Sequence, residues 1–383
     1  MTHDVVVLGL GAMGSAAALE LARRGRRVLG LERYGPAHAF GSSHGGSRIY
    51  RQSYFEDSAY VPLLLRAWDR WQELGPECYV ETGGLYFGPS DGRTFRGCLR
   101  SAEQWNLPHD VLDPAAVARR FPAFALRRGE LALYEQCAGY VRPEATVAAQ
   151  LSLAAAAGAE LRFGEPALSW SASGRGVEVR TAAGTYAAGT LVLTAGAWMP
   201  LLAGLDVPMV VERQVMHWLA PAADIGPYER NPVFIAGDGP DQVYGFPAID
   251  GPAGGVKIAF FRAGEPTDPD TVDRTVRPAE VAAIRARAAQ VLPGLTGPPV
   301  AATVCLYTTT PDEHFVIGPH PEHPHVVIAA GFSGHGFKFV QVVGEILADL
   351  AVDGRTDLPI ELFDPLRFGG DRAAGGADYS TPM

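Results

Sequence analysis

Apolar and polar residues follow two different periods along the first part of the chain. Residues 5–8 form an apolar run, and after a glycine turn the apolar side chains recur at helical spacing until Gly25. A second apolar run then ends at Glu32. These periods predict a strand, a helix that stops at the glycine, and a second strand. This order of elements is typical of a nucleotide-binding unit.

The same periodicities predict further elements along the rest of the chain. Apolar runs that end in glycine turns, as buried parallel strands do, occur in the middle of the chain and again near its end. The glycine- and alanine-rich tail after Pro365 has no periodicity and is expected to be loose. The main predicted elements are helices at residues 60–74, 143–158 and, facing solvent, between Pro278 and Pro293, a strand at 190–196, a strand-rich region at 211–261, and a final strand, glycine loop and helix at 325–350.

Helix and strand patterns at both ends of the chain enclose a strand-rich middle. With 383 residues the chain exceeds what one hydrophobic core usually supports, so we expect two domains. The predicted fold is an α/β Rossmann-type nucleotide-binding domain with an inserted α+β domain whose sheet is mostly antiparallel. The first domain is expected to comprise residues 1–85, 140–210 and 305–383, and the second residues 86–139 and 211–304.

Composition excludes several classes of protein. A net charge of −10 argues against nucleic-acid binding, which normally requires a basic face. No apolar run approaches the roughly 20 residues that span a bilayer, and no signal segment is visible, so a soluble cytoplasmic protein is expected. The four cysteines form no CxxC pair, which argues against a disulfide framework or a zinc site.

A glycine motif follows the first predicted strand. Gly9, Gly11 and Gly14 have the GxGxxG spacing, and Glu32 lies 18 residues after the last of them. Glycines at these positions permit a tight turn and a close approach of the backbone to a pyrophosphate, while the acid can bind a ribose hydroxyl. The motif predicts a dinucleotide site and does not by itself separate FAD from NAD.

A second glycine-rich turn precedes the last helix. Gly331, Gly334 and Gly336 leave backbone N–H groups at the start of that helix, where they can stabilise negative charge on a reduced flavin. The alternative is a plain strand-to-helix turn.

Several charged or reactive residues have both a structural and a functional interpretation. Lys257 lies in a predicted strand, where it could extend from an edge or supply a fixed positive charge near a flavin. Arg48 and Arg51 could be solvated or could bind a carboxylate. Cys305 alone reads as a small buried residue. Prolines interrupt the histidines within residues 314–325, so no metal site is expected there.

Four segments of the chain carry a resemblance to a known family. They are GLGAMGSAAALELARRG, GSSHGGSRIYR, TAGAW and CLYTTTPDEHFVIGPHPEHPHVVIAAGFSGHGFKF. With them, nearly the whole chain resembles the monomeric sarcosine oxidase and N-methyltryptophan oxidase family. The resemblance implies an FAD-binding Rossmann-type domain, a sheet-based substrate domain, and oxidation of secondary amino acids by oxygen to imines, with hydrogen peroxide as by-product.

The resemblance also implies roles for individual residues. Arg51 and Lys338 would bind the substrate carboxylate, and Lys257 would activate oxygen. Cys305 would bond covalently to the 8α-methyl carbon of the flavin. His44 and Arg48 would act beside the flavin ring, and Tyr244, Tyr307, Phe261 and Gly334 would line the substrate cavity. The FAD contacts implied are Gly9, Gly11, Gly14, Glu32, Ser42, Ser43, His44, Arg48, Gly196, Cys305, Gly334, His335, Gly336, Phe337 and Lys338.

One position departs from the family pattern. Phe261 stands four residues after Lys257, where the family carries a histidine in the substrate pocket. The apolar ring changes the shape of the pocket and removes a hydrogen-bonding group, which favours a bulkier or more apolar amine. Two alternatives stay open: oxidation of a cyclic imino acid in a biosynthetic pathway, and a flavoprotein subunit that passes electrons to a partner. A monomer or weak homo-oligomer is expected.

Overall fold

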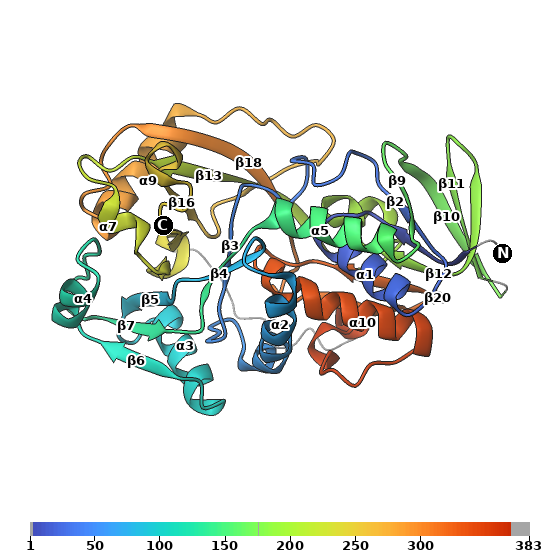
Figure 1. Ribbon diagram of the computed structural model, residues 1–383, viewed down its shortest axis with the longest axis horizontal. Helices are drawn as coiled ribbons and strands as arrows, with labels where there is room; N and C mark the ends of the chain where they lie inside the picture. Colours follow the sequence, from blue (N-terminus) through green and yellow to red (C-terminus); the bar gives the residue numbers. More distant parts are fainter. Residues whose placement is uncertain (1–2, 175, 369–383) are drawn as a thin grey trace.

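The computed structural model describes residues 3–174 and 176–368, which form two large sheets and a small one, with helices packed around them (Figure 1). The predicted loose tail beyond residue 368 lies outside the described residues. The first sheet lies with α1, α5 and α10 at one end of the molecule (Figure 1). The second sheet, which contains the long strands β13 and β18, lies at the other end (Figure 1).

The first sheet has eight strands and contains the predicted nucleotide-binding unit. Its central strands β20, β12, β1, β2 and β9 are paired in parallel in that order, as in a Rossmann-type fold. Strands β10, β11 and β19 extend it in antiparallel pairs. The strands are β1 (His3–Leu8), β2 (Val28–Leu31), β9 (Glu160–Arg162), β10 (Ala167–Ser173), β11 (Gly176–Thr181), β12 (Thr185–Leu193), β19 (Val316–His320) and β20 (His323–Ala330).

The second sheet has nine strands, and only the pair β14–β5 is parallel. It matches the prediction of a mostly antiparallel substrate domain. Its strands are β5 (Gly84–Pro89), β6 (His109–Leu112), β7 (Glu130–Glu135), β13 (Val210–Leu219), β14 (Val233–Ala236), β15 (Val243–Gly245), β16 (Val256–Phe260), β17 (Glu265–Pro266) and β18 (Pro299–Thr309). The division into domains stays a prediction, and β18 runs across the expected boundary between residues 304 and 305.

A third sheet of three short strands, β3 (Arg48–Tyr50), β8 (Gly139–Val141) and β4 (Tyr79–Glu81), carries Arg48 and leads directly to Arg51. The helices are α1 (Ala12–Arg23), α2 (Val61–Leu74), α3 (Arg93–Gln104), α4 (Pro114–Arg120), α5 (Pro143–Ala156), α6 (Met199–Leu202), α7 (Gly226–Glu229), α8 (Gly251–Gly254), α9 (Pro278–Val291) and α10 (Val340–Asp353). The predicted helices at 60–74 and 143–158 are confirmed. Helix α9 faces solvent only in part, because Ile284, Ala288 and Val291 are buried.

Helices α1 and α10 pack closely because one contact position is a glycine. A Cβ atom on Gly344 would lie 2.7 Å from the Cβ of Ala16, so a larger residue would force the two helices apart. Both helices begin beside a glycine turn, one after Gly9 and the other after Gly334. Their close packing therefore fixes the two turns relative to each other.

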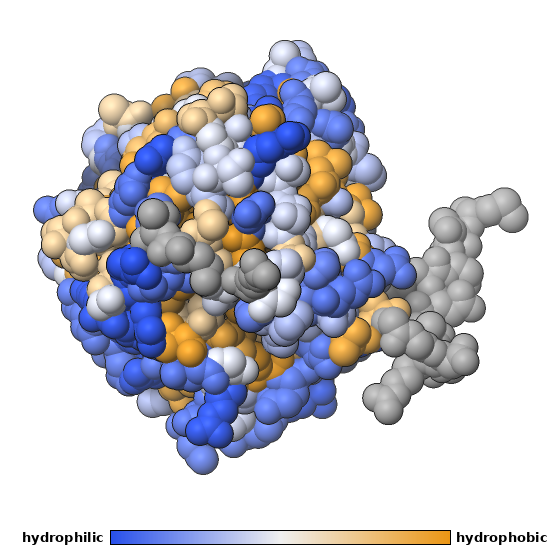
Figure 2. All heavy atoms as spheres, turned by 90° about the vertical axis from the view of Figure 1, so that its right-hand side faces the viewer, coloured by the Kyte–Doolittle hydropathy of each residue, from blue (hydrophilic) through white to orange (hydrophobic). Residues whose placement is uncertain are grey.

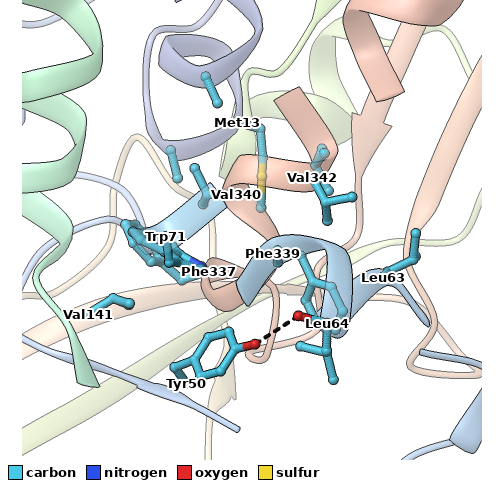
Figure 3. Packing of buried hydrophobic residues seen from close by; sticks show 14 of the residues in the cluster. Met13, Tyr50, Leu63, Leu64, Trp71, Val141, Phe337, Phe339, Val340 and Val342 are labelled. Atoms are coloured by element: carbon cyan, nitrogen blue, oxygen red, sulfur yellow. Dashed lines mark hydrogen bonds between the residues drawn. The ribbon is translucent and has the colours of Figure 1, made fainter. Parts of the chain in front are cut away.

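A buried cluster of apolar residues supports the start of α10 from the side of α2 (Figure 3). Trp71 of α2 is fully buried and stacks near Phe337, with ring centroids 6.3 Å apart. Tyr50 anchors the third sheet to the same helix, because its hydroxyl donates a 2.7 Å hydrogen bond to the carbonyl oxygen of Leu64. The cluster ties Arg51, which follows Tyr50, to the segment that contains Lys338.

The outer surface shows no extended apolar face in the view of Figure 2, where hydrophobic and hydrophilic residues are mixed. Among the described residues, no helix is both long enough and apolar enough to cross a lipid bilayer.

Candidate functional site

The glycine turn after β1 requires residues without side chains. Gly9 has φ +90°, and a Cβ atom there would lie 2.7 Å from the carbonyl oxygen of Thr194. A Cβ atom on Gly14 would lie 1.8 Å from the carbonyl oxygen of Gly9. The turn, the strand β12 and helix α1 therefore meet at distances that only glycine permits.

Glu32 at the end of β2 is held beside this turn. Its carboxylate accepts hydrogen bonds from the backbone N–H of Leu10 at 2.8 Å and of Tyr34 at 2.9 Å. Burial acts to raise the pKa of Glu32, but His38 and these backbone donors leave it lowered. The residue is therefore an ionised acceptor, as the ribose-binding role predicted for it requires.

A cavity of about 330 Å³ is lined by the glycine turn and by residues from both large sheets. Its wall continues past α6 and β20 to Arg48 and Tyr307. The glycine turn, the acid and a large, mostly apolar cavity fit a dinucleotide such as FAD. Ten of the residues predicted to contact FAD line it: Gly9, Gly11, Glu32, Ser42, Ser43, Arg48, Gly196, Gly334, Gly336 and Phe337.

A smaller cavity of about 50 Å³ adjoins the first, because Arg48, Tyr307, Gly334 and Phe337 line both. The structure brings together here all of the predicted substrate-binding residues: Arg51, Lys338, Tyr244, Tyr307, Phe261 and Gly334. His335 also lines this cavity. The apolar part of the wall is completed by Ile49 and Ile235, which were not predicted from the sequence.

Arg51 is buried and already holds an anionic partner. Its Nη2 lies 2.7 Å and 2.5 Å from the two carboxylate oxygens of Glu56, and its Nη1 donates to the carbonyl oxygen of Ser53 at 2.7 Å. Burial acts to raise the pKa of Glu56, but Arg51 above all lowers it to about 2. Glu56 was not predicted from the sequence, and it occupies Nη2 of the guanidinium that is expected to bind a substrate carboxylate.

Lys338 follows the second glycine turn and lies on the same side of the small cavity. Its Nζ donates to the carbonyl oxygen of His335 at 2.7 Å, and Trp71 Nε1 donates to the carbonyl oxygen of Lys338 itself at 2.9 Å. Burial, and then the charge of Arg51, hold the pKa of Lys338 well below its usual range. A bound carboxylate would favour the charged form of this lysine.

Lys257 lies behind the loop that leads to Arg48 and lines neither cavity. Its Nζ donates to the carbonyl oxygens of Gly45 at 2.7 Å and Ser47 at 2.8 Å. Glu144 holds the same loop from the other side, because it accepts the backbone N–H of Gly45 at 2.6 Å. Burial and the charge of Arg48 hold the pKa of Lys257 well below its usual range. The sequence contains only two lysines, and both are buried at this site.

Cys305 and His44 stand beside Arg48, just behind the wall of the large cavity. The Sγ of Cys305, which is 1 % exposed, lies 3.5 Å from Arg48 Nη2. The next residue, Leu306, lines the cavity and accepts a hydrogen bond from Ser42 through its carbonyl. Burial, and then the charges of Arg48 and Lys257, lower the pKa of His44 to about 3, so its ring is neutral.

The wall of the small cavity is rich in aromatic rings. The hydroxyl groups of Tyr244 and Tyr307 lie 3.4 Å apart, and burial raises the pKa of both. Phe261 packs edge-on against Tyr244 and Phe55, with ring centroids 6.4 Å and 6.2 Å away. The tyrosines are therefore neutral, and Phe261 presents an apolar ring where an imidazole was expected.

Four of the predicted site residues line neither cavity: Gly14, His44, Lys257 and Cys305. They act instead on the residues that form the cavity walls. Glu32 was predicted from the sequence, but the acidic residues Glu56 and Glu144 were not. Glu56 lies in a polar loop and Glu144 in the first turn of a helix, where glutamate is common for local reasons. The sequence contains one indication of the Arg51–Glu56 pair, which is that Glu56 lies only five residues after Arg51.

Comparison with known proteins places these observations in context. The model of the family described as FAD dependent oxidoreductase matches residues 4–350. The chain is 55% identical over 375 residues to monomeric sarcosine oxidase from Streptomyces avermitilis, covering 96% of this chain and 98% of that protein. It is 34% identical over 379 residues to N-methyl-L-tryptophan oxidase from Escherichia coli K12, covering 96% of this chain and 100% of that protein.

Two solved structures of amino-acid oxidoreductases also match the fold of this chain. NikD, described as an unusual amino acid oxidase essential for nikkomycin biosynthesis, matches with a TM-score of 0.83 and 27% identity over 95% of this chain and 97% of that chain. L-proline dehydrogenase from P. horikoshii matches with a TM-score of 0.84 and 25% identity over 96% of this chain and 98% of that chain.

Proposed function

Because the chain belongs to the family of FAD-dependent oxidoreductases, we propose that it is an oxidase of secondary amines, with N-methyl and other N-substituted amino acids as substrates. The products are an imine and hydrogen peroxide. One observation carries this proposal: the small cavity that adjoins the dinucleotide cavity is lined by Arg51 and Lys338 together with the aromatic rings of Tyr244, Phe261 and Tyr307. Sarcosine and N-methyl-L-tryptophan are named in the relatives' descriptions and are the first candidates.

The residues of the large cavity would hold FAD along its length. The glycine turn and the start of α1 would receive the pyrophosphate, and Glu32 would bind a ribose hydroxyl. The segment Gly334–Phe337 and Arg48 would lie at the end that adjoins the small cavity. When bound, FAD supplies the two-electron oxidation of the carbon beside the amine nitrogen and passes the electrons to oxygen.

Arg51 and Lys338 would orient the substrate through its carboxylate. The guanidinium can bind a carboxylate with two parallel hydrogen bonds, and the ammonium adds a point charge. Since Glu56 now pairs with Arg51, the substrate must displace this carboxylate or share the guanidinium with it. Binding therefore exchanges one buried ion pair for another.

The charges around the small cavity would also set the protonation state of the amine. Arg48, Arg51 and Lys338 all line this cavity, and positive charges disfavour a further cation. The neutral amine is the form whose carbon–hydrogen bond can be oxidised. The neutral tyrosines Tyr244 and Tyr307 can accept or donate a hydrogen bond to it without acting as a dedicated base.

Lys257, Arg48 and His44 would act at the step with oxygen. Arg48 is a fixed, desolvated cation, and such groups stabilise negative charge that develops when oxygen is reduced. Burial and Arg48 favour the neutral form of Lys257, so developing negative charge would favour its protonation. His44, which is neutral and buried, would act from behind the wall. The loop between Gly45 and Ser47 holds Lys257 in place.

Cys305 would bind FAD covalently through its sulfur. Its position supports this proposal, because its Sγ lies 3.8 Å from the carbonyl oxygen of Ser42 and 3.5 Å from Arg48 Nη2, and both residues line the large cavity. The test is acid precipitation of the purified protein. A yellow pellet is expected from the natural protein, and a yellow supernatant from Cys305→Ser. Release of all colour from the natural protein would contradict the covalent bond.

The proposed activity is tested by oxygen uptake with purified protein and no added partner. The panel contains sarcosine, N-methyl-L-tryptophan, a cyclic imino acid such as pipecolate, and glycine. Oxygen uptake with equimolar peroxide is expected for an N-methyl amino acid, and glycine is the control without an N-substituent. Reduction of the flavin without peroxide would instead indicate electron transfer to a partner protein.

The cyclic imino acid alternative predicts a different stoichiometry. Uptake of two oxygen molecules per pipecolate, against one per sarcosine, would indicate a four-electron oxidation towards an aromatic ring. Location in the cytoplasm and a monomeric or weakly associated state remain predictions from the sequence.

A further inference from the structure

Glu135 is a buried carboxylate that the proposed mechanism does not use. It is the last residue of β7, lies opposite Gly84 of β5 and His109 of β6, and is 1 % exposed. Among the described residues, no lysine or arginine nitrogen lies within ion-pairing distance of its oxygens. A buried carboxylate without a basic partner is unfavourable unless hydrogen bonds compensate.

The hydrogen bonds that compensate Glu135 come from the turn that follows Arg51. One carboxylate oxygen accepts the backbone N–H of Gln52 at 2.7 Å, and the other accepts the backbone N–H of Ser53 at 3.0 Å. Both oxygens are therefore used at once by two successive amides. Burial raises the pKa of Glu135, and the two amides of Ser53 and Gln52 oppose this rise because they favour the ionised carboxylate, which accepts through both oxygens.

The same turn determines where the guanidinium of Arg51 lies. Arg51 Nη1 donates to the carbonyl oxygen of Ser53 at 2.7 Å, so its side chain folds back over the peptides that Glu135 holds. The guanidinium carbon also lies 4.1 Å from the ring centroid of Tyr54 and 4.5 Å from that of Phe55. Moving the turn would therefore move the guanidinium.

We propose that Glu135 is a positioning residue for substrate recognition: it fixes the turn at residues 52–53 and thereby holds the guanidinium of Arg51 where a substrate carboxylate binds. This inference rests on the proposed function, because it takes Arg51 as a carboxylate-binding residue. It adds a residue of the second sheet that lines neither cavity.

The test compares two ligands that differ only in the carboxylate. Butanoate is sarcosine with CH2 in place of the nitrogen, and butanamide is its uncharged counterpart. Binding of each to the FAD-loaded protein is followed by the change in the flavin absorption spectrum. Glu135→Gln keeps the side-chain shape but faces one of the two amides with an NH2 group, so the turn is released on one side.

We expect Glu135→Gln to weaken butanoate binding by about tenfold and to leave butanamide binding within about twofold of the natural protein. The matched control is Asp238→Asn, which removes another carboxylate that accepts a backbone amide, that of Thr94 at 2.7 Å. This control is expected to change neither affinity by more than about twofold. KM for sarcosine should rise in Glu135→Gln with a smaller change in kcat.

Equal weakening of both ligands, or butanoate binding as tight as in the natural protein, would overturn the inference. If Glu135→Gln fails to accumulate as folded yellow protein, Glu135→Asp replaces it, because it keeps the charge but shortens the reach, and the same selective loss is expected. Failure of the proposed function is distinguishable, since the natural protein would then neither oxidise any N-methyl amino acid of the panel nor bind butanoate.

Discussion

Arg51 and Glu56 form a buried ion pair in the wall of the small cavity, with the guanidinium Nη2 2.7 Å and 2.5 Å from the carboxylate oxygens. Both side chains are almost completely shielded from solvent. The residue predicted to bind a substrate carboxylate thus carries a carboxylate of the protein itself. Substrate affinity must then reflect the difference between two ion pairs and not the strength of one.

Glu56→Gln removes this internal competitor. We expect butanoate to bind roughly three- to tenfold more tightly, while the ligand-free protein loses roughly 3 kcal/mol of unfolding free energy because a buried arginine is left unpaired. Spectral titration and denaturant unfolding measure the two effects. Glu280→Gln is the control, because it breaks another pair with a buried arginine, Arg213, and should not tighten butanoate binding.

Lys257→Met replaces a buried amino group with an apolar chain of similar length. We expect oxidation of the reduced protein by oxygen to slow by roughly 100-fold or more, because the variant can no longer carry a positive charge where negative charge develops. Stopped-flow absorbance measures this step separately from anaerobic reduction by substrate. Lys338→Met is the matched comparison and should raise KM while oxygen reacts at the normal rate. If reduced Lys257→Met reacts with oxygen as fast as the reduced natural protein, Lys257 has no role in the oxygen step.

Gly14→Ala places a methyl group 1.8 Å from the carbonyl oxygen of Gly9 and 2.6 Å from Thr194 Oγ1. Since neither neighbour can move without opening the turn, we expect the purified protein to lose most of its FAD. The ratio of visible to protein absorbance measures the loss. Gly35→Ala is the control, because a methyl group there meets no atom within 4 Å, and full FAD content is expected.

We expect the buried residue His217 to lower the free energy of unfolding in mild acid. It is buried on β13, neither ring nitrogen has a hydrogen-bond partner among the described residues, and burial lowers its pKa to about 4. The unfolded chain takes up a proton below about pH 6.5, whereas the folded protein does so only near pH 4. Stability is therefore full above pH 6.5 and falls by roughly 1–2 kcal/mol as the pH drops through this window.

His217→Leu should remove this part of the pH dependence. Denaturant unfolding at several pH values between 7.5 and 4.5 measures it, and the curves of the natural protein and the variant should converge or cross towards low pH. Curves that stay parallel over this range would show that His217 does not titrate differently in the folded and unfolded chain.

Local chain geometry explains what could be read directly from the sequence. The turn at Gly9, Gly11 and Gly14, its flanking strand and helix, and the acid at Glu32 depend on residues close together in the chain. Sterics and backbone hydrogen bonding act over such short separations, so the pattern alone predicted the unit. The resemblance to a known family then indicated which distant residues line the small cavity, and the structure brings Arg51, Lys338, Tyr244 and Phe261 together there.

Only the tertiary structure decided which partners the buried acidic side chains contact. Glu56, Glu135 and Glu144 read as ordinary solvated acids in the sequence, yet each is held against a backbone amide or a cation at the site. Their roles depend on segments that are distant in the chain, such as β7 and the turn after Arg51. Burial strengthens such contacts and shifts pKa values, and burial is a property of the packed molecule and not of a sequence pattern.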